Sequence, residues 1–240
     1  MNKYHQEILK KIKKAQSEKR KAQSRKLKSA PMGYLGNNHF RYCLSNPQER
    51  RIVADWQKVN KNIANKDFIG LLDSLYRAKS FEEKTIAGIL LEKYSCKKEI
   101  NPQKIGEWLN FLEGWAEVDM TCQSSFEAKD LLVQWPEWQE LITSLVKDKN
   151  INKRRASLVL LARAMRGSAD PRLAKIAFIN IEKLKGEKHV LITKAISWIL
   201  RSLIKYHKRE MADYLKKNKD SLPRIAVRET QIKLATGRKN

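Results

Sequence analysis

The stretch RRASLVLLARAM, residues 154–165, keeps its apolar residues at the spacing of an α-helix. The run TIAGILLEKY, residues 85–94, has the same pattern. In contrast, no stretch combines alternating apolar and polar residues with a two-residue Gly or Asn turn, and the chain has only 9 glycines. The sequence therefore predicts an all-α fold.

Sequences typical of helix starts precede many of these runs. SNPQERR, residues 45–51, offers Asn46 as the cap, a proline at the first helical position and Glu49 as the returning partner of a capping box. SFEEK at 80–84 and DPRL at 170–173 repeat the device. These starts divide the chain into short helices joined by short loops.

Apolar helices that each begin with a basic residue recur near Lys84, Arg155, Lys194 and Arg224, and Arg155 and Lys194 are 39 residues apart. A period of roughly 35 to 40 residues, with two helices in each unit, is typical of a HEAT-like α-solenoid. Stacked helix pairs form a curved surface whose concave face is made by the second helix of each pair. We therefore expect a curved solenoid with a basic concave face, lined by the basic residues that open these helices.

The charge of the chain is large and unevenly spread. Lys and Arg number 50 against 26 Asp and Glu, which gives a net charge of +24. A field of this strength attracts polyanions, so nucleic acid is the leading partner class, ahead of ribosomes and anionic membranes. Residues 1–30 hold 11 basic and 2 acidic side chains, whereas residues 101–150 hold 4 basic and 9 acidic ones.

Residues 1–30 have too few apolar positions to bury a continuous helix face. We interpret them as a basic N-terminal arm or helix, with a solvated tail of no specific role as the alternative. Residues 31–240 are interpreted as one repeat domain.

Several classes of protein and site are excluded by the sequence. The cysteines, Cys43, Cys96 and Cys122, lie far apart without a CxxC or histidine spacing, which indicates reduced thiols. No apolar run approaches the roughly 20 residues of a membrane helix. Nucleotide-binding, serine-hydrolase and zinc-protease motifs are absent, and we expect neither a metal nor a cofactor. A cytoplasmic protein, associated with the nucleoid when bound to DNA, is expected.

Two pairs of residues at helical spacing are candidates for a site. Trp115 and Asp119 are four residues apart, and Trp198 and Arg201 are three apart, so each pair lies on one helix face. Most tryptophans on amphipathic helices belong to the core, and a lone aspartate is usually solvated. Neither pair is specific by itself.

An ordered set of motifs gives a more specific indication. The set is YLGNNHFRYCLSNPQERRIVADW at 34–56, EKTIAGILLEKY at 83–94, WAEVD at 115–119, KRRASLVLLARAM at 153–165 and KAISWILRSL at 194–203. In this order the motifs resemble the AlkD-type alkylpurine DNA glycosylases, a HEAT-like DNA alkylation repair family, from about residue 34 to 236. The basic N-terminal segment exceeds the usual family pattern.

The resemblance implies a role for residues in these motifs. The family's working tryptophan and aspartate of the W-x-x-x-D element correspond to Trp115 and Asp119, and its second tryptophan corresponds to Trp198. The arginines that hold the DNA backbone correspond to Arg155 and Arg201. Arg154 and Lys194, in the same motifs, are further candidates for DNA binding.

The activity implied is that of a monofunctional DNA N-glycosylase in base excision repair. Its substrates would be positively charged alkylpurines of the 3-methyladenine and 7-methylguanine type in duplex DNA, removed without a base-reading pocket. The first alternative is a HEAT-like DNA-binding protein without catalysis, and a protein-binding scaffold or an RNA-binding role also stays open. We expect a monomer with alkylated double-stranded DNA as its partner and no membrane association.

Overall fold

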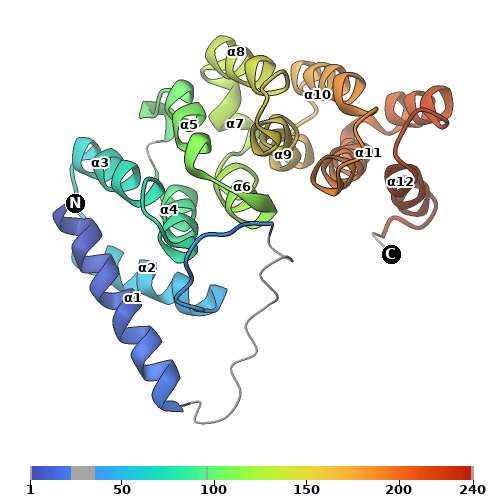
Figure 1. Ribbon diagram of the computed structural model, residues 1–240. Helices are drawn as coiled ribbons and strands as arrows, with labels where there is room; N and C mark the ends of the chain where they lie inside the picture. The colour runs from blue at the N-terminus through green and yellow to red at the C-terminus, as the bar shows by residue number, and fades with distance from the viewer. Residues whose placement is uncertain (1, 23–35, 96, 239–240) are drawn as a thin grey trace. The chain divides into compact units, whose positions relative to one another are not determined.

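The computed structural model describes residues 2–22, 36–95 and 97–238 (Figure 1). The described residues form twelve α-helices and two short 3-10 helices and contain no strand, so the predicted all-α fold is confirmed. The α-helices are α1 (Lys3–Ala22), α2 (Asn46–Val59), α3 (Asn65–Tyr76), α4 (Phe81–Lys93), α5 (Pro102–Trp108), α6 (Gly114–Cys122), α7 (Ala128–Leu132), α8 (Trp135–Leu145), α9 (Ile151–Gly167), α10 (Pro171–Leu184), α11 (Val190–Asn218) and α12 (Arg224–Thr236); the 3-10 helices are η1 (Lys97–Glu99) and η2 (Leu109–Phe111).

The chain divides into two compact units, each described here by itself. The first unit contains Met1–Ile100 and Glu107–Ser125, and the second contains Asn101–Gly106 and Phe126–Asn240. Helices α1 to α4 and α6 therefore belong to the first unit, and α7 to α12 belong to the second. The predicted curvature and the basic concave face of a solenoid remain predictions.

Two of the three predicted helix caps are confirmed. Ser80 caps α4 in a capping box with Glu83, and Asp170 caps α10, its side chain accepting from the Arg172 backbone N–H. The prediction for α2 is wrong by one residue, because Ser45 is the cap and its backbone N–H donates to Gln48 Oε1 at 2.9 Å. Asn46 is already helical, and Glu49 is buried in the core instead of returning to the cap.

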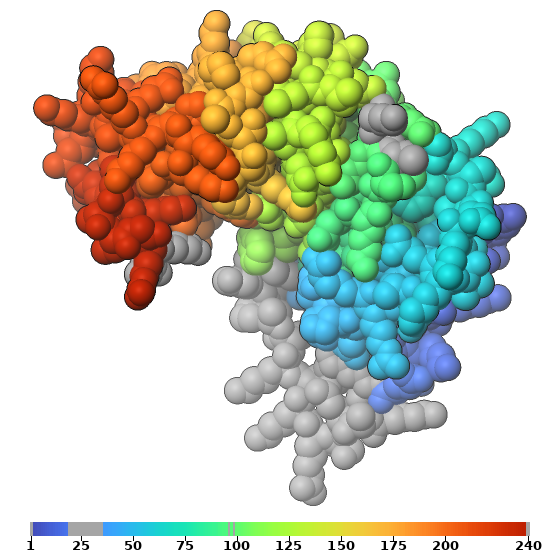
Figure 2. Space-filling model, turned by 180° about the vertical axis from the view of Figure 1, so that it is seen from behind, coloured from blue at the N-terminus to red at the C-terminus, as the bar shows by residue number. Residues whose placement is uncertain are grey.

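The basic N-terminal segment forms a packed helix over the part that the structure describes. Helix α1 lies against α2 and α3, and Figure 2 shows it beside them at the surface of the first unit. His5, Ile8 and Ile12 recur three and four residues apart and are buried, with both isoleucines fully inaccessible. The three side chains are enough to attach the helix, so the expectation that it could not bury a face is wrong for this segment. Residues 23–30 of the predicted arm lie outside the described residues.

A buried polar contact fixes the start of α1. His5 Nδ1 lies 2.7 Å from Ser74 Oγ in α3, and His5 Nε2 lies 2.7 Å from Glu83 Oε1 in α4. Burial raises the pKa of the Glu83 carboxyl, but the bonds from His5 and Ser80 outweigh it, and the pKa is lowered from its ordinary value. Glu83 thus serves both the cap of α4 and the attachment of α1.

Helix α11 consists of two helical segments joined at a kink. His207 has φ −123° and ψ 40°, which is not helical, so residues 190–206 and 208–218 are separate segments. The second segment packs beside α10, where Tyr214 donates to Glu182 and Lys185 donates to Asn218. Helix α12 packs beside the first segment. The two segments of α11 therefore pack against different helices, residues 208–218 against α10 and residues 190–206 against α12.

The spacing of side-chain contacts follows this pairing. Bonds between helices of successive pairs join residues 36 apart for Arg155 and the Leu191 carbonyl, and 39 apart for Lys205 and the Arg166 carbonyl. Between the first segment of α11 and α12 the separation is 32 residues, for Ser197 and Glu229. The first two separations match a repeated helix pair of roughly 35 to 40 residues, and the third is shorter.

Candidate functional site

Helix α6 carries Trp115 and Asp119 on its partly exposed side. At 3.6 residues per turn, two residues four positions apart lie almost above one another. Both side chains are partly exposed, so Trp115 is not fully buried in the core. The opposite side of α6 is buried and consists of Glu117, Val118, Thr121 and Cys122.

A glycine in α4 lets α6 approach closely at the residue that follows Asp119. A Cβ on Gly88 would lie 2.7 Å from Met120 Cγ and 3.1 Å from the Met120 carbonyl carbon. The contact with the Met120 backbone cannot be relieved by a rotamer change, so a larger residue at position 88 would have to displace α6. The position of Asp119 relative to the core of the first unit therefore depends on Gly88.

The start of α6 is held by a buried carboxylate. Glu117 is fully inaccessible, accepts from the Glu113 backbone N–H at 2.9 Å, and lies 2.8 Å from His39 Nδ1. Burial raises the pKa of Glu117, and the bond from His39 opposes that shift. At least one acidic residue of the segment 101–150, Glu117, therefore has a structural role, and its carboxyl group points into the core.

Four residues of α11 form one stripe at helical spacing, at positions i, i+4, i+7 and i+11. The stripe is Lys194, Trp198, Arg201 and Lys205. The two lysines are exposed, and Trp198 and Arg201 are partly exposed, between residues that are buried. Lys205 was not predicted as a site residue, although its position seven residues after Trp198 was a signal that could have found it.

The Arg201 guanidinium is held in place within the second unit. Its Nε donates to the Ser197 carbonyl at 3.1 Å, and its Nη2 lies 3.2 Å from Glu229 Oε2 in α12. Burial lowers the pKa of Arg201, and Glu229 opposes that shift. The carboxylate and the carbonyl hold the guanidinium in one position. Because a guanidinium has five N–H groups, Arg201 keeps N–H donors that could bind an anion.

Arg154 and Arg155, the other predicted DNA-binding arginines, join α9 to the chain around the start of α11. Arg155 is 4% exposed, and its Nη1 donates to the Leu191 carbonyl at 2.5 Å. Arg154 pairs with Glu187 at 2.7 Å and donates to two backbone carbonyls. Both guanidinium groups therefore carry structural contacts, and a role for them in DNA binding stays a prediction.

The structure brings the predicted residues together in two sets. Trp115 and Asp119 share the partly exposed side of α6 in the first unit. Lys194, Trp198 and Arg201 share the stripe on α11 in the second unit. That the two sets form one centre stays a prediction.

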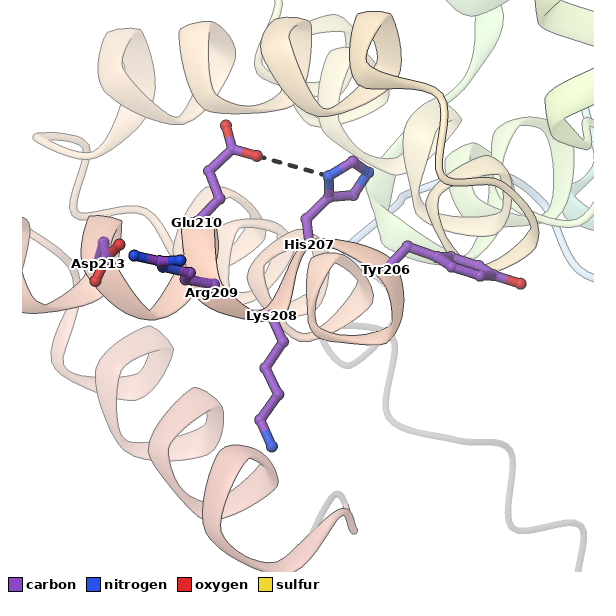
Figure 3. Close-up of a pocket in the computed structure, with 6 residues that line it drawn as sticks. All are labelled: Tyr206, His207, Lys208, Arg209, Glu210 and Asp213. Atoms are coloured by element: carbon purple, nitrogen blue, oxygen red, sulfur yellow. Dashed lines mark ion pairs between the residues drawn. The ribbon is translucent and has the colours of Figure 1, made fainter.

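The remaining hollows and clusters offer less chemistry. A hollow of about 420 Å³ lies at the kink of α11 and is lined by residues of that helix alone, with His207 Nδ1 3.6 Å from Glu210 Oε2 (Figure 3). Within residues 2–22, 36–95 and 97–238, no group of three or more His, Cys, Asp and Glu side chains is placed to hold a metal. In the same ranges, every helix is too short or too polar to cross a bilayer.

Comparison with known proteins agrees with the helical arrangement. A protein of Enterococcus faecalis, described as a predicted DNA alkylation repair enzyme, superposes with a TM-score of 0.68 at 16% identity, over 85% of this chain and 93% of that one. At this identity the likeness concerns the fold. No curated protein matches the chain. The family model of the DNA alkylation repair enzymes matches residues 8–234, nearly the whole sequence. The chain therefore belongs to the DNA alkylation repair enzyme family.

Proposed function

We propose that the protein is a DNA glycosylase that removes positively charged alkylpurines, such as 3-methyladenine and 7-methylguanine, from duplex DNA. The observation that carries the proposal is the partial exposure of Trp115 and Asp119 on α6. A tryptophan and a carboxylate four residues apart share the partly exposed side of a helix whose opposite side packs at Gly88 and holds the buried Glu117. Trp198 on α11 is partly exposed as well.

The chemistry needs few groups because the substrate base is already cationic. Hydrolysis of an ordinary glycoside uses two carboxyl groups, one to protonate the leaving group and one to stabilise the sugar cation or activate water. When an alkylated purine leaves, the electron pair of the C–N bond neutralises the charge of the base, and no acid is needed. One carboxylate is then sufficient.

Asp119 is the carboxylate assigned to this reaction. Its negative charge would stabilise the deoxyribose cation that forms as the C–N bond breaks, and it would orient the water whose oxygen bonds to the sugar. Electrostatic stabilisation of this kind contributes roughly 3 to 4 kcal/mol for one well-placed group in a site that excludes water. The ring faces of Trp115 and Trp198 would add about 0.5 to 2 kcal/mol of cation–π attraction as positive charge develops on the sugar.

The mechanism also predicts which bases are not excised. A site that uses the lability of a cationic nucleotide gives no help to a neutral base, which leaves as a poor anion. Uracil and hypoxanthine should therefore stay in the DNA, whereas 7-methylguanine is released. Efficient removal of either neutral base would contradict this mechanism.

The test is release of 7-methylguanine from methylated duplex DNA by the wild type and by Asp119→Asn. The substitution keeps the size of the side chain and removes its charge, so the single-turnover rate should fall at least 100-fold. The affinity for duplex DNA should stay within about threefold. If both proteins release no base but bind DNA tightly, the alternative of a DNA-binding protein without catalysis is correct.

A further inference from the structure

Five cationic side chains lie near the ends of three helices in the second unit. They come from the last two turns of α9, from the end of the first segment of α11, and from the last turn of α12. The five are Arg163, Arg166, Arg201, Lys205 and Lys233, here called the C-terminal cation cluster. Figure 1 shows α9, α11 and α12 following one another in this unit.

Hydrogen bonds tie these helix ends to each other. Lys205 Nζ of α11 donates to the Arg166 carbonyl of α9 at 2.8 Å. Lys233 Nζ of α12 donates to the Arg201 carbonyl of α11 at 3.0 Å. Each lysine thus reaches back to the backbone of an earlier helix. An ammonium group has three N–H donors, and each of these bonds uses one of them.

The charge of the cluster is only partly balanced. Arg163 Nη2 pairs with Glu127 at 2.5 Å, and Arg201 pairs with Glu229 at 3.2 Å. In the part of the chain that the structure describes, the Arg166 side chain makes no hydrogen bond or ion pair, although it is only partly exposed. Among the described residues, Arg166 is therefore the arginine of the cluster without a carboxylate partner.

The cations also lie close enough to repel one another. Burial lowers the pKa of Arg166, and the neighbouring Arg163 and Arg201 lower it further. Burial likewise lowers the pKa of Lys233, followed by Arg201 and Arg166. Helix carbonyl ends carry a partial negative charge that favours cations, but about half a charge for each helix does not offset this crowding. A bound anion would relieve it.

We propose that the C-terminal cation cluster is a binding site for a phosphate group of the DNA backbone, with Arg166 and Lys233 as its principal new ligands. The proposal rests on the proposed function, because it takes duplex DNA as the partner. Arg201 and Lys205 belong to the stripe of Trp198 on α11, so the cluster begins one turn from that tryptophan. A phosphate held there would lie beside the surface that carries Trp198.

The guanidinium of Arg166 is suited to this ligand. Its planar N–H groups match the oxygens of a phosphate and can donate two parallel bonds, and the side chain keeps its charge at any physiological pH. Arg155, by contrast, is buried and bonded to the Leu191 carbonyl, and Arg154 donates to two carbonyls and to Glu187. The cluster can therefore supply the phosphate contacts that were assigned to those two arginines from the sequence.

The experiment measures the salt dependence of binding to unmodified duplex DNA for the wild type, Arg166→Gln and Lys233→Gln. Lys183→Gln is the matched control, because Lys183 is an exposed cation on α10 of the same unit. Loss of one phosphate contact lowers the slope of log affinity against log salt by about 0.9. Each cluster variant should show this change and bind about tenfold more weakly at low salt. The control should keep the wild-type slope.

Thermal unfolding separates a binding role from a structural one. Without an anion, Arg166→Gln should unfold at the same temperature as the wild type or slightly higher, because a crowded cation is removed. If both cluster variants fold and keep the wild-type slope and affinity, the proposed phosphate site is wrong.

Two further outcomes keep this inference separate from the proposed function. If the wild type releases no alkylated base but Arg166→Gln still lowers the slope of log affinity against log salt, the phosphate site is supported and the proposed glycosylase activity is wrong. The other possible ligand is a small phosphate compound. It is tested by comparing the unfolding temperature in inorganic phosphate with that in chloride at equal ionic strength. If phosphate protects the wild type but not Arg166→Gln, while the two have equal DNA affinity, the site binds small phosphate compounds and the DNA assignment is overturned.

Discussion

Substitution of Gly88 by alanine tests whether the close approach of α4 and α6 sets the position of Asp119. The added Cβ would lie 2.7 Å from Met120 Cγ, 3.1 Å from its carbonyl carbon and 3.2 Å from its carbonyl oxygen. The first contact can be relieved by rotation of the Met120 side chain. The other two involve backbone, so α6 must move by a few tenths of an ångström.

The free energy of unfolding follows from two opposing effects. Replacing glycine by alanine inside a helix favours folding by about 0.8 to 1 kcal/mol. Overpacking in a core costs about 1 to 3 kcal/mol. Gly70→Ala is the matched control, because Gly70 lies inside α3 and its Cβ would meet its nearest neighbour, Asn2 Nδ2, at an ordinary 3.5 Å. We expect Gly70→Ala to be more stable than the wild type, and Gly88→Ala to be less stable than Gly70→Ala by about 1 to 3 kcal/mol, the overpacking cost.

The assay combines urea unfolding with single-turnover release of 7-methylguanine. A shift of α6 displaces Asp119, so Gly88→Ala should release the base at least tenfold more slowly while its DNA affinity stays near that of the wild type. Equal stability of the two alanine variants would refute the tight packing. A normal rate in a clearly destabilised Gly88→Ala would refute the link between this contact and Asp119.

Three further predictions concern buried groups of the first unit. Burial raises the pKa of Glu49 from 4.5 to about 8, so its contribution to stability is complete below pH 4.5 and is lost as pH rises toward 8. The loss has a slope of up to about 1.4 kcal/mol per pH unit, and thermal unfolding of Glu49→Gln between pH 5 and 8 should show a smaller fall than the wild type. Ile12→Ala should lower the free energy of unfolding by about 2 to 5 kcal/mol, whereas Lys13→Ala on the exposed side of α1 should change it by less than about 0.5, both measured in urea; equal effects would mean that α1 is not packed. His39→Ala leaves the buried carboxyl of Glu117 without its histidine and should cost about 1 to 3 kcal/mol at pH 7, a loss that Glu117→Gln in the same chain should reduce.

The sequence predicted features that depend on local spacing better than features that depend on distant contacts. The caps at Ser80 and Asp170 follow from residues within three positions of each other, and both were found. The bond from His39 to Glu117 joins residues 78 apart, and no local pattern marks either as its partner. The sequence therefore gives no sign that Glu117 is fully buried.

The same reasoning explains why α1 was underestimated. A helix with few apolar residues can still be attached when those residues face a receptive surface, as Ile8 and Ile12 do. That surface belongs to α2 and α3, more than 30 residues along the chain, and only the folded structure shows it. The exposure of Trp115 could not be read from its spacing either, because core and surface tryptophans follow the same helical pattern.

The basic residues at the helix starts differ in whether their charge is available to a ligand, because some of them are buried. The sequence suggested that basic residues at helix starts line a groove, but Lys84 is 2% exposed and donates to the Tyr76 carbonyl, and Arg155 is 4% exposed and donates to the Leu191 carbonyl. The N-terminal end of a helix carries partial positive charge, so a buried cation there is unfavourable unless a carbonyl stabilises it. Cations at the carbonyl ends need less compensation, and Arg166 and Lys233 keep N–H donors for a ligand. The phosphate contacts of the second unit are therefore expected at the ends of its helices and at the two helix starts whose cations are exposed, Lys194 and Arg224.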